Sequence, residues 1–224
     1  MADQERLNRI NVFPVADGDT GTNLAMTMQS ILSALARSDA HHAGRVLELV
    51  ADAALDGAKG NSGAILAQFF HGLGDACGQL RTITADPFVD AVRQGARYAR
   101  EALSEPREGT ILTVLAEFAA AIDMSRNKGQ DFVTLLDAGL RRAVQALAET
   151  TNQLDVLRRA GVVDAGAQGF VDLLQGICAF VHEGSLEDIP KSSLAVAAEA
   201  RIDHGSHQPT CEHRFCTECT VTGE

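Results

Sequence analysis

The chain has 224 residues, of which 46% are hydrophobic and only 4% aromatic, and its formal net charge is −11. This length suits one large domain or two small ones, and the acidic excess argues against binding of nucleic-acid phosphates. No apolar run reaches the roughly 18–20 residues that a membrane-spanning helix needs, and the first ten residues lack the apolar core of a signal peptide. We therefore expect a cytoplasmic protein with a core of Ala, Leu, Val and Ile, a composition that favours packed helices.

Apolar residues recur with the helical period along most of the chain. No segment before residue 210 shows the alternation of a convincing strand. The pattern predicts an all-α fold, a bundle of about eight helices. The expected helices carry their apolar faces within residues 24–35, 46–53, 65–73, 88–103, 111–122, 136–147, 152–160 and 170–181.

Single residues refine these expectations. Pro87 is expected at the first helical position of its helix, and Gly161 is expected as the left-handed end of the short helix at 152–160. The apolar faces are expected to be buried, and they include Leu32, Val144, Ile177, Cys77 and Cys178.

The composition changes near residue 184. Residues 184–213 are polar and contain Gly, Pro and Ser, as linkers do, so residues 1–183 are expected to form the folded domain. Residues 214–224 alternate weakly and then stop. Because a single strand is not stable alone, we expect them to be the start of a second domain that this chain lacks.

Four glycine-rich segments interrupt the helical pattern, and each precedes an apolar helical face. Free backbone N–H groups and the helix dipole favour anions at a helix N-terminus, and glycine lets a phosphate approach the backbone. Four such starts at one end of a bundle would cradle a nucleotide, although the residue order is not that of a P-loop or a dinucleotide-binding loop. The segments are DGDTGTN at 17–23, GAKGNSG at 57–63, EGT at 108–110 and VVDAGAQG at 162–169.

Asp17 and Asp19 stand one residue apart in the first segment. Their negative charges repel each other unless a cation offsets the repulsion. Carboxylate oxygens suit Mg²⁺, which completes its shell with phosphate oxygens and water. The structural alternative is that one Asp caps the helix that follows. Capping explains one carboxylate better than a pair, so we expect the pair to bind Mg²⁺.

The segments NVFPVADGDTGTNL, GAKGNSGAIL, EGTILTV and GVVDAGAQGF, in this order and spacing, resemble the nucleotide-binding domain of bacterial fatty acid kinases. That domain is similar to the ATP-binding L subunit of dihydroxyacetone kinases. The resemblance covers roughly residues 5–183, and RFCTE at 214–218 resembles the start of the next domain of fatty acid kinases. It implies a barrel of about eight antiparallel helices with the nucleotide at one end.

The resemblance also implies which residues form the site. Asp17 and Asp19 would hold Mg²⁺ in the catalytic centre, and Asn11 stands near the position of a third metal ligand. The nucleotide, ATP or ADP, would bind through its phosphates to Thr20, Gly21, Thr22 and Asn23, with further contacts from Asn61, Ser62, Gly109, Thr110, Asp164, Ala165 and Gly166.

The implied reaction transfers the γ-phosphoryl group of ATP to the carboxylate of a fatty acid held on a separate binding protein, giving an acyl phosphate. The family has a long helix before the first motif, whereas only ten residues precede Asn11 here. We therefore expect one wall of the barrel to be missing. Later domains are also expected to be absent, so the chain should bind Mg-ATP but turn over little without them and the partner. A homodimer would form through the missing domain.

Two alternatives stay open. A dihydroxyacetone (glycerone) kinase subunit would use the same nucleotide site for a different acceptor. A zinc-binding or nucleotide-binding regulatory module would have no turnover. Its zinc form would use Cys and His residues at short spacing in the tail, although their layout fits no common zinc finger. These residues are His204, His207, Cys211, His213, Cys216 and Cys219.

Overall fold

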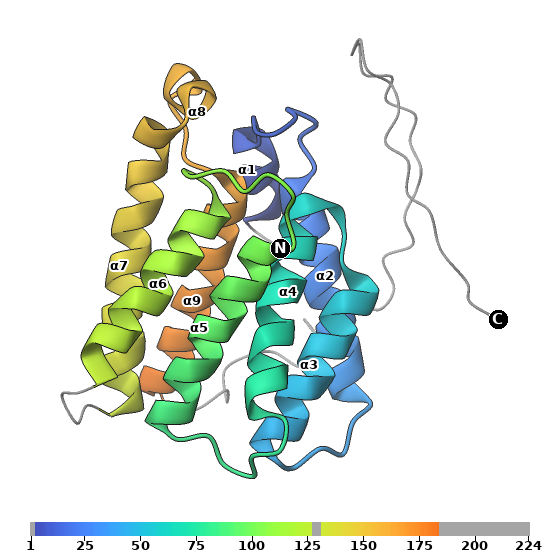
Figure 1. Cartoon of the computed structure of the whole chain (residues 1–224). Helices are drawn as coiled ribbons and strands as arrows, with labels where there is room; N and C mark the ends of the chain where they lie inside the picture. Colours follow the sequence, from blue (N-terminus) through green and yellow to red (C-terminus); the bar gives the residue numbers. More distant parts are fainter. Residues whose placement is uncertain (1–2, 127–130, 184–224) are drawn as a thin grey trace. The chain divides into compact units, whose positions relative to one another are not determined.

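A computed structural model describes residues 3–126 and 131–183 (Figure 1), which belong to one compact unit, Met1–Asp188. All regular secondary structure in these two ranges is helical, which confirms the all-α prediction. The predictions for the linker and for the Cys and His residues of the tail lie outside the described residues. The helices are α1 (Gln4–Ile10), α2 (Thr20–Ala36), α3 (Ala43–Gly57), α4 (Gly60–Cys77), α5 (Ala85–Glu101), α6 (Ile111–Ser125), α7 (Phe132–Gln153), α8 (Asp155–Ala160) and α9 (Ala165–Glu183).

The seven long helices of the described residues form a closed ring. Each one from α2 to α7 packs against the next along the chain, α7 packs against α9, and α9 packs against α2. The connections alternate between the two ends of the ring, so successive helices run in opposite directions (Figure 1). A ring of seven cannot alternate throughout. The pair α9 and α2 therefore runs parallel, which refines the expected barrel of about eight antiparallel helices, and the short α1 packs against both.

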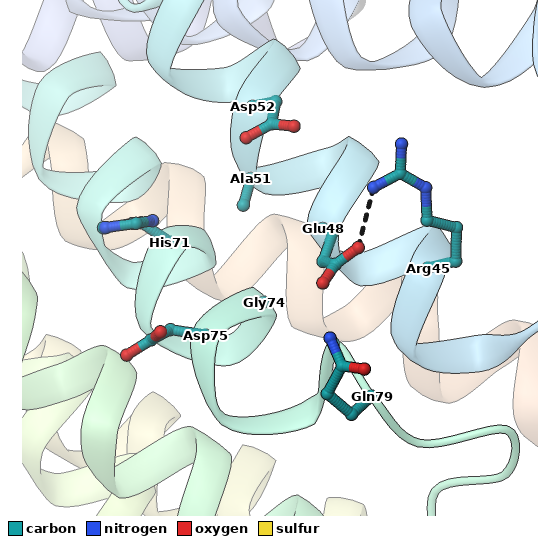
Figure 2. A pocket seen from close by; sticks show the side chains of 9 residues that line it. Arg45, Glu48, Ala51, Asp52, His71, Gly74, Asp75 and Gln79 are labelled. Carbon is teal, nitrogen blue, oxygen red and sulfur yellow. Dashed lines mark hydrogen bonds and ion pairs between the residues drawn. The ribbon is translucent and has the colours of Figure 1, made fainter.

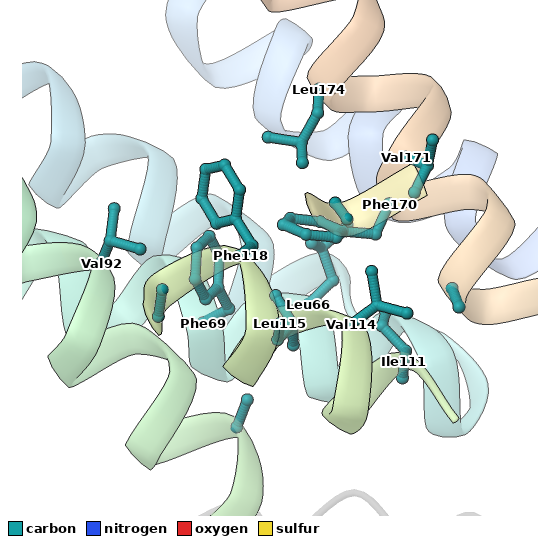
Figure 3. Packing of buried hydrophobic residues seen from close by; sticks show 14 of the residues in the cluster. Leu66, Phe69, Val92, Ile111, Val114, Leu115, Phe118, Phe170, Val171 and Leu174 are labelled. Atoms are coloured by element: carbon teal, nitrogen blue, oxygen red, sulfur yellow. The ribbon is translucent and has the colours of Figure 1, made fainter. Parts of the chain in front are cut away.

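Three phenylalanines lie at the centre of the ring, one each from α4, α6 and α9 (Figure 3). Phe170 packs edge-to-face against Phe69 and against Phe118, with ring centroids 5.6 Å apart in both pairs. All three rings are buried. Because each of these helices begins at a glycine-rich segment, the cluster holds three of those segments in fixed relative positions.

Most positions of the predicted apolar faces are buried, including Cys77 and Cys178. Three predictions are wrong: the exposed fractions of Leu32, Val144 and Ile177 are 42%, 42% and 39%. A helix in a ring turns only part of its circumference inward. Leu32, Val144 and Ile177 lie at the margins of their apolar stripes, and such marginal positions face outward.

Two predicted helix ends can be compared with the structure. α5 begins at Ala85 and has Thr84 as its N-cap, so Pro87 is the third helical residue and the prediction of the first position is wrong. α8 ends at Ala160 and is capped by Gly161, whose φ of 66° is left-handed, as expected. Within the part of the chain that the structure describes, no helix is long and apolar enough to cross a membrane.

Candidate functional site

The four glycine-rich segments lie at the same end of the ring, as predicted, in the connections that lead into α2, α4, α6 and α9 (Figure 1). Each of these connections contains one glycine with a left-handed backbone: Gly18, Gly60, Gly109 and Gly161. No other residue in the described ranges has a positive φ. Side chains with a Cβ rarely adopt this conformation. Glycine therefore permits the sharp turn in each connection, which at Gly161 ends α8 before α9 begins.

Close contacts join neighbouring segments. Gly60 lies against the side chain of Asn23, where an added Cβ would overlap Nδ2. This contact joins the first segment to the second. An added Cβ at Gly166 would lie 2.9 Å from Ser62 Oγ, which places the fourth segment against the second. The predicted site residues are therefore neighbours in space although they are far apart in the sequence.

The two carboxylates of the first segment are exposed. Asp19 occupies the N-cap position of α2, but its side chain makes no capping hydrogen bond. The pKa of Asp17 is raised above its ordinary value, first by partial burial and then by the negative charge of Asp19. The two side chains thus form a pair of like charges, and helix capping does not explain the presence of Asp19.

Asn11 caps α2 in place of either aspartate. Its Oδ1 accepts hydrogen bonds from Asp19 N and Thr20 N, both at 3.2 Å, and its Nδ2 donates to Val15 O at 3.0 Å. The side chain is buried, with an exposed fraction of 5% for the residue. The structure therefore gives Asn11 a role in holding the turn, whereas its role as a metal ligand stays a prediction.

Helix α1 holds the next residues of the first segment, through contacts that the sequence analysis missed. Thr22 Oγ1 accepts hydrogen bonds from Gln4 Nε2 and Asn8 Nδ2, both at 3.0 Å, and Thr22 N donates to Asn8 Oδ1 at 3.1 Å. Gln4 and Asn8 lie four residues apart on one face of a helix. That spacing is the only sequence signal for the contact, and it leaves the partner unspecified.

Helix α4 presents the most open N-terminus of the four. The backbone N–H groups of Gly60, Asn61 and Ser62 have no acceptor among the described residues. Lys59 N, just before them, donates to Thr27 Oγ1 at 3.2 Å. Three free N–H groups at the positive end of an 18-residue helix are able to donate to an anion such as phosphate.

The start of α6, by contrast, is already capped by side chains, so the four helix starts differ in how many free N–H groups they offer. Thr110 Oγ1 accepts from Leu112 N at 3.3 Å and donates to Arg107 O at 2.7 Å. Gly109 N donates to Thr113 Oγ1 at 2.9 Å. Threonine at an N-cap competes for the N–H groups that a phosphate would need, and the sequence pattern alone could not tell which of the two uses prevails.

Asp164 joins the third and fourth segments. Its Oδ2 accepts from Ile111 N (3.0 Å) at the start of α6 and from Ala167 N (2.8 Å) at the start of α9. Asp164 N donates to Thr150 Oγ1 at 3.2 Å. Burial raises the pKa of the Asp164 carboxyl from 3.8 to about 6, because little solvent reaches the charged form. The structure shows a bridge between two helix starts, and the expected contact with the nucleotide stays a prediction.

The other predicted nucleotide-binding residues differ in how accessible they are. Asn61 is exposed, and Thr22, Asn23 and Ser62 are half-buried. The remaining ones are buried: Thr20, Gly21, Gly109, Thr110, Asp164, Ala165 and Gly166. A ligand can thus reach Thr22, Asn23, Asn61 and Ser62 from solvent, whereas the predicted residues of the last two segments are covered by the fold.

Within the described ranges, two features that a ligand site can have are absent here. Among the described residues, no group of three or more His, Cys, Asp and Glu side chains could hold a metal ion, so Asp17 and Asp19 stand as a pair. A cavity of about 530 Å³ lies between α3 and α4, toward the end opposite the glycine-rich segments, and none of the predicted site residues lines it (Figure 2). Its lining consists of Arg45, Glu48, Ala51, Asp52, His71, Gly74, Asp75, Gly78 and Gln79.

Comparison with known proteins identifies the family. The DAK2 domain matches residues 14–179, a range that includes all four glycine-rich segments. The chain is 32% identical over 223 residues to Protein YloV of Bacillus subtilis and 36% identical over 221 residues to an uncharacterized protein of Staphylococcus saprophyticus. Each match covers 96% of this chain but 40% of the relative, so the chain spans about two fifths of their length. The chain therefore belongs to the DAK2 domain family, the nucleotide-binding domains of dihydroxyacetone kinase-like kinases.

Proposed function

We propose that the chain is the ATP- and Mg²⁺-binding domain of a kinase that phosphorylates a fatty acid carboxylate held on a carrier protein. The observation that carries the proposal is a juxtaposition at one end of the ring. The open N-terminus of α4 is joined through the contact of Gly60 with Asn23 to the segment that carries Asp17 and Asp19. An anion site beside a pair of uncompensated carboxylates suits a polyphosphate that arrives with a divalent cation.

The carboxylate pair fits Mg²⁺ in its donor chemistry. Asp17 and Asp19 would hold the ion with hard oxygen atoms, and phosphate oxygens and water would complete its shell. Bound there, the ion would supply charge neutralisation for the transferring phosphoryl group. Partial burial and then repulsion by Asp19 raise the pKa of Asp17, and the ion would offset that repulsion. This explains why the Asp19 side chain, at the N-cap position of α2, makes no capping hydrogen bond.

The nucleotide would lie across the helix starts. The N–H groups of Gly60, Asn61 and Ser62 would donate to phosphate oxygens, since they have no acceptor among the described residues. Thr20 and Gly21 at the start of α2 would approach the same phosphates, and Asn23 would approach from the next turn. The fourth segment, with Ala165 and Gly166, would lie near the adenosine.

Such a site works by positioning and by electrostatics, because the protein supplies no covalent nucleophile. Backbone donors that are fixed before the reaction stabilise charge on the phosphoryl group without reorganising. A fatty acid carboxylate oxygen would attack the γ-phosphorus, the bond to the β-phosphate oxygen would break, and ADP and an acyl phosphate would form. The fatty acid as acceptor rests on the resemblance of the four segments, and its carrier would be a separate protein of the cytoplasm.

A second candidate is phosphorylation of dihydroxyacetone, and membership of the DAK2 family favours it. The nucleotide site would be the same, and a hydroxyl oxygen would be the acceptor. The two candidates therefore differ only in what the partner subunit presents to the γ-phosphate.

Phosphoryl transfer to different acceptors tests the proposal. The chain is incubated with Mg-ATP and either a fatty-acid-loaded carrier protein, free fatty acid or dihydroxyacetone, and ADP release is measured. Hydroxylamine traps any acyl phosphate as a hydroxamate. We expect slow hydroxamate formation with the loaded carrier and none with free fatty acid. ADP release with dihydroxyacetone alone would instead establish the second candidate, and efficient turnover of free fatty acid would contradict the need for a carrier.

A further inference from the structure

We propose that Asn11 is a positioning residue that shapes the Asp17–Asp19 turn for the cation and is not itself a metal ligand. The inference rests on the proposed function, because it assigns a role within the same site. Its evidence is the set of hydrogen bonds that the Asn11 side chain makes to the two ends of the turn.

The Asn11 amide closes the turn like a clamp. Nδ2 donates to Val15 O, which precedes the two aspartates, and Oδ1 accepts from Asp19 N and Thr20 N, which follow Asp17. One side chain thus spans the segment from Val15 to Thr20. The contact needs a donor and an acceptor on the same planar group, which an amide has and a carboxylate lacks.

The same hydrogen bonds leave little capacity for a cation. Oδ1 is the only atom of the Asn11 side chain that could coordinate Mg²⁺, and both of its lone pairs are directed at backbone N–H groups. Nδ2 is a donor and cannot coordinate a cation. Asn11 is also buried, whereas both aspartates are exposed. The geometry therefore separates a buried group that holds the turn from two exposed groups that are free to bind.

Asn8 performs the corresponding task two residues further along, within the first turn of α2. It pairs with Thr22 through both its donor and its acceptor, Nδ2 to Thr22 Oγ1 and Oδ1 from Thr22 N. Together, the two asparagines satisfy the N–H groups of Asp19, Thr20 and Thr22. A helix start normally takes such caps from its own Ser, Thr, Asp or Asn. Because Asn8 and Asn11 take this role, the carboxylates of Asp17 and Asp19 remain available.

The substitution Asn11→Asp separates the two roles by the sign of its effect. If Asn11 is a ligand, a third carboxylate should tighten Mg²⁺ binding. If Asn11 positions the turn, Asp loses the donor to Val15 O, and we expect Mg-ATP affinity to fall by about 10- to 100-fold, as for other groups that orient metal ligands. Asn11→Ala should weaken binding in the same direction. Gln175→Glu, an exposed amide in the middle of α9, controls for the added negative charge.

Hydrogen exchange of the nucleotide-free protein provides a readout that does not depend on nucleotide binding. In the wild type, we expect Asp19 N–H and Thr20 N–H to be protected by Asn11 Oδ1. In Asn11→Ala, their exchange should be at least about tenfold faster, while exchange in α6 stays unchanged. Equal rates in the two proteins would overturn the proposal, as would wild-type or tighter Mg-ATP binding by Asn11→Asp. If the wild type binds no Mg-ATP, the proposed function fails, and the exchange rates still decide whether Asn11 holds the turn.

Discussion

Replacing the buried Asp164 by Asn should change how the stability of the protein depends on pH. The folded protein holds the pKa of this carboxyl at about 6, against an ordinary value of 3.8. Between these pH values, the unfolded chain releases the proton while the folded chain keeps it, so unfolding becomes easier as the pH rises. The stability contribution is fully present below pH 3.8 and is lost as the pH rises through about 6.

The magnitude follows from the two pKa values. At 1.36 kcal/mol per pH unit, the full loss is about 3 kcal/mol, and about 2 kcal/mol of it falls between pH 4.5 and pH 7.5. In Asp164→Asn, this loss is absent, because the amide has no charge to bury. The amide oxygen can still accept from Ile111 N and Ala167 N, as Oδ2 does in the wild type.

Urea unfolding at a series of pH values between 4.5 and 7.5 measures the effect. The free energy of unfolding of the wild type should fall by about 2 kcal/mol more than that of Asp164→Asn, or about 4–8 °C in Tm for a domain of this size. Asp56→Asn removes an exposed carboxylate and controls for the loss of one negative charge. Parallel pH profiles for the wild type and Asp164→Asn would refute the reasoning.

Three further predictions concern the cation pair, the helix contacts and the core. Asp17→Asn and Asp19→Asn should each reduce the Tm increase that Mg-ATP produces, without lowering the Tm of the nucleotide-free protein, because each removes one of two repelling charges; an undiminished increase in both variants would contradict the metal site. Gly72→Ala places a Cβ 2.5 Å from Gly95 Cα, so we expect the free energy of unfolding, measured with urea, to fall by about 1–3 kcal/mol. Gly176→Ala, with no atom within 4 Å of the added Cβ, should instead raise it by roughly 0.5–1 kcal/mol. Equal effects of the two substitutions would contradict the close packing of α4 and α5. Phe170→Ala should lose about 3–5 kcal/mol by the same measurement, and a loss under about 1 kcal/mol would show that its ring is not central to the core.

The features that depend on local pattern could be predicted from the sequence. The helical period gave all seven long helices of the described residues, and Gly161 ended its short helix as expected. The position of each glycine-rich segment before an apolar face also predicted that the segments meet at one end. These predictions succeeded because helix periodicity and left-handed glycines are properties of neighbouring residues.

Features that depend on long-range partners could not be predicted. Nothing in the sequence around Thr22 shows that Gln4 and Asn8 occupy its hydroxyl, because the contact joins two helices. The same holds for Asp164. Its place in the segment VVDAGAQG predicts a contact with the nucleotide, whereas in the structure its carboxylate connects the starts of α6 and α9. Val144 shows the corresponding limit for the core: its stripe is apolar, but the ring decides which side is covered.

Calorimetric titration of ATP into the full chain, with Mg²⁺ in excess and again with the cation removed by EDTA, tests the central claim most directly. Binding through the N–H groups of α4 and a cation on Asp17 and Asp19 predicts saturable binding of one ATP per chain with Mg²⁺ and much weaker binding without it. Affinity that is the same in the presence and absence of Mg²⁺, or no binding in either case, would contradict the claim that this end of the ring is a Mg-ATP site.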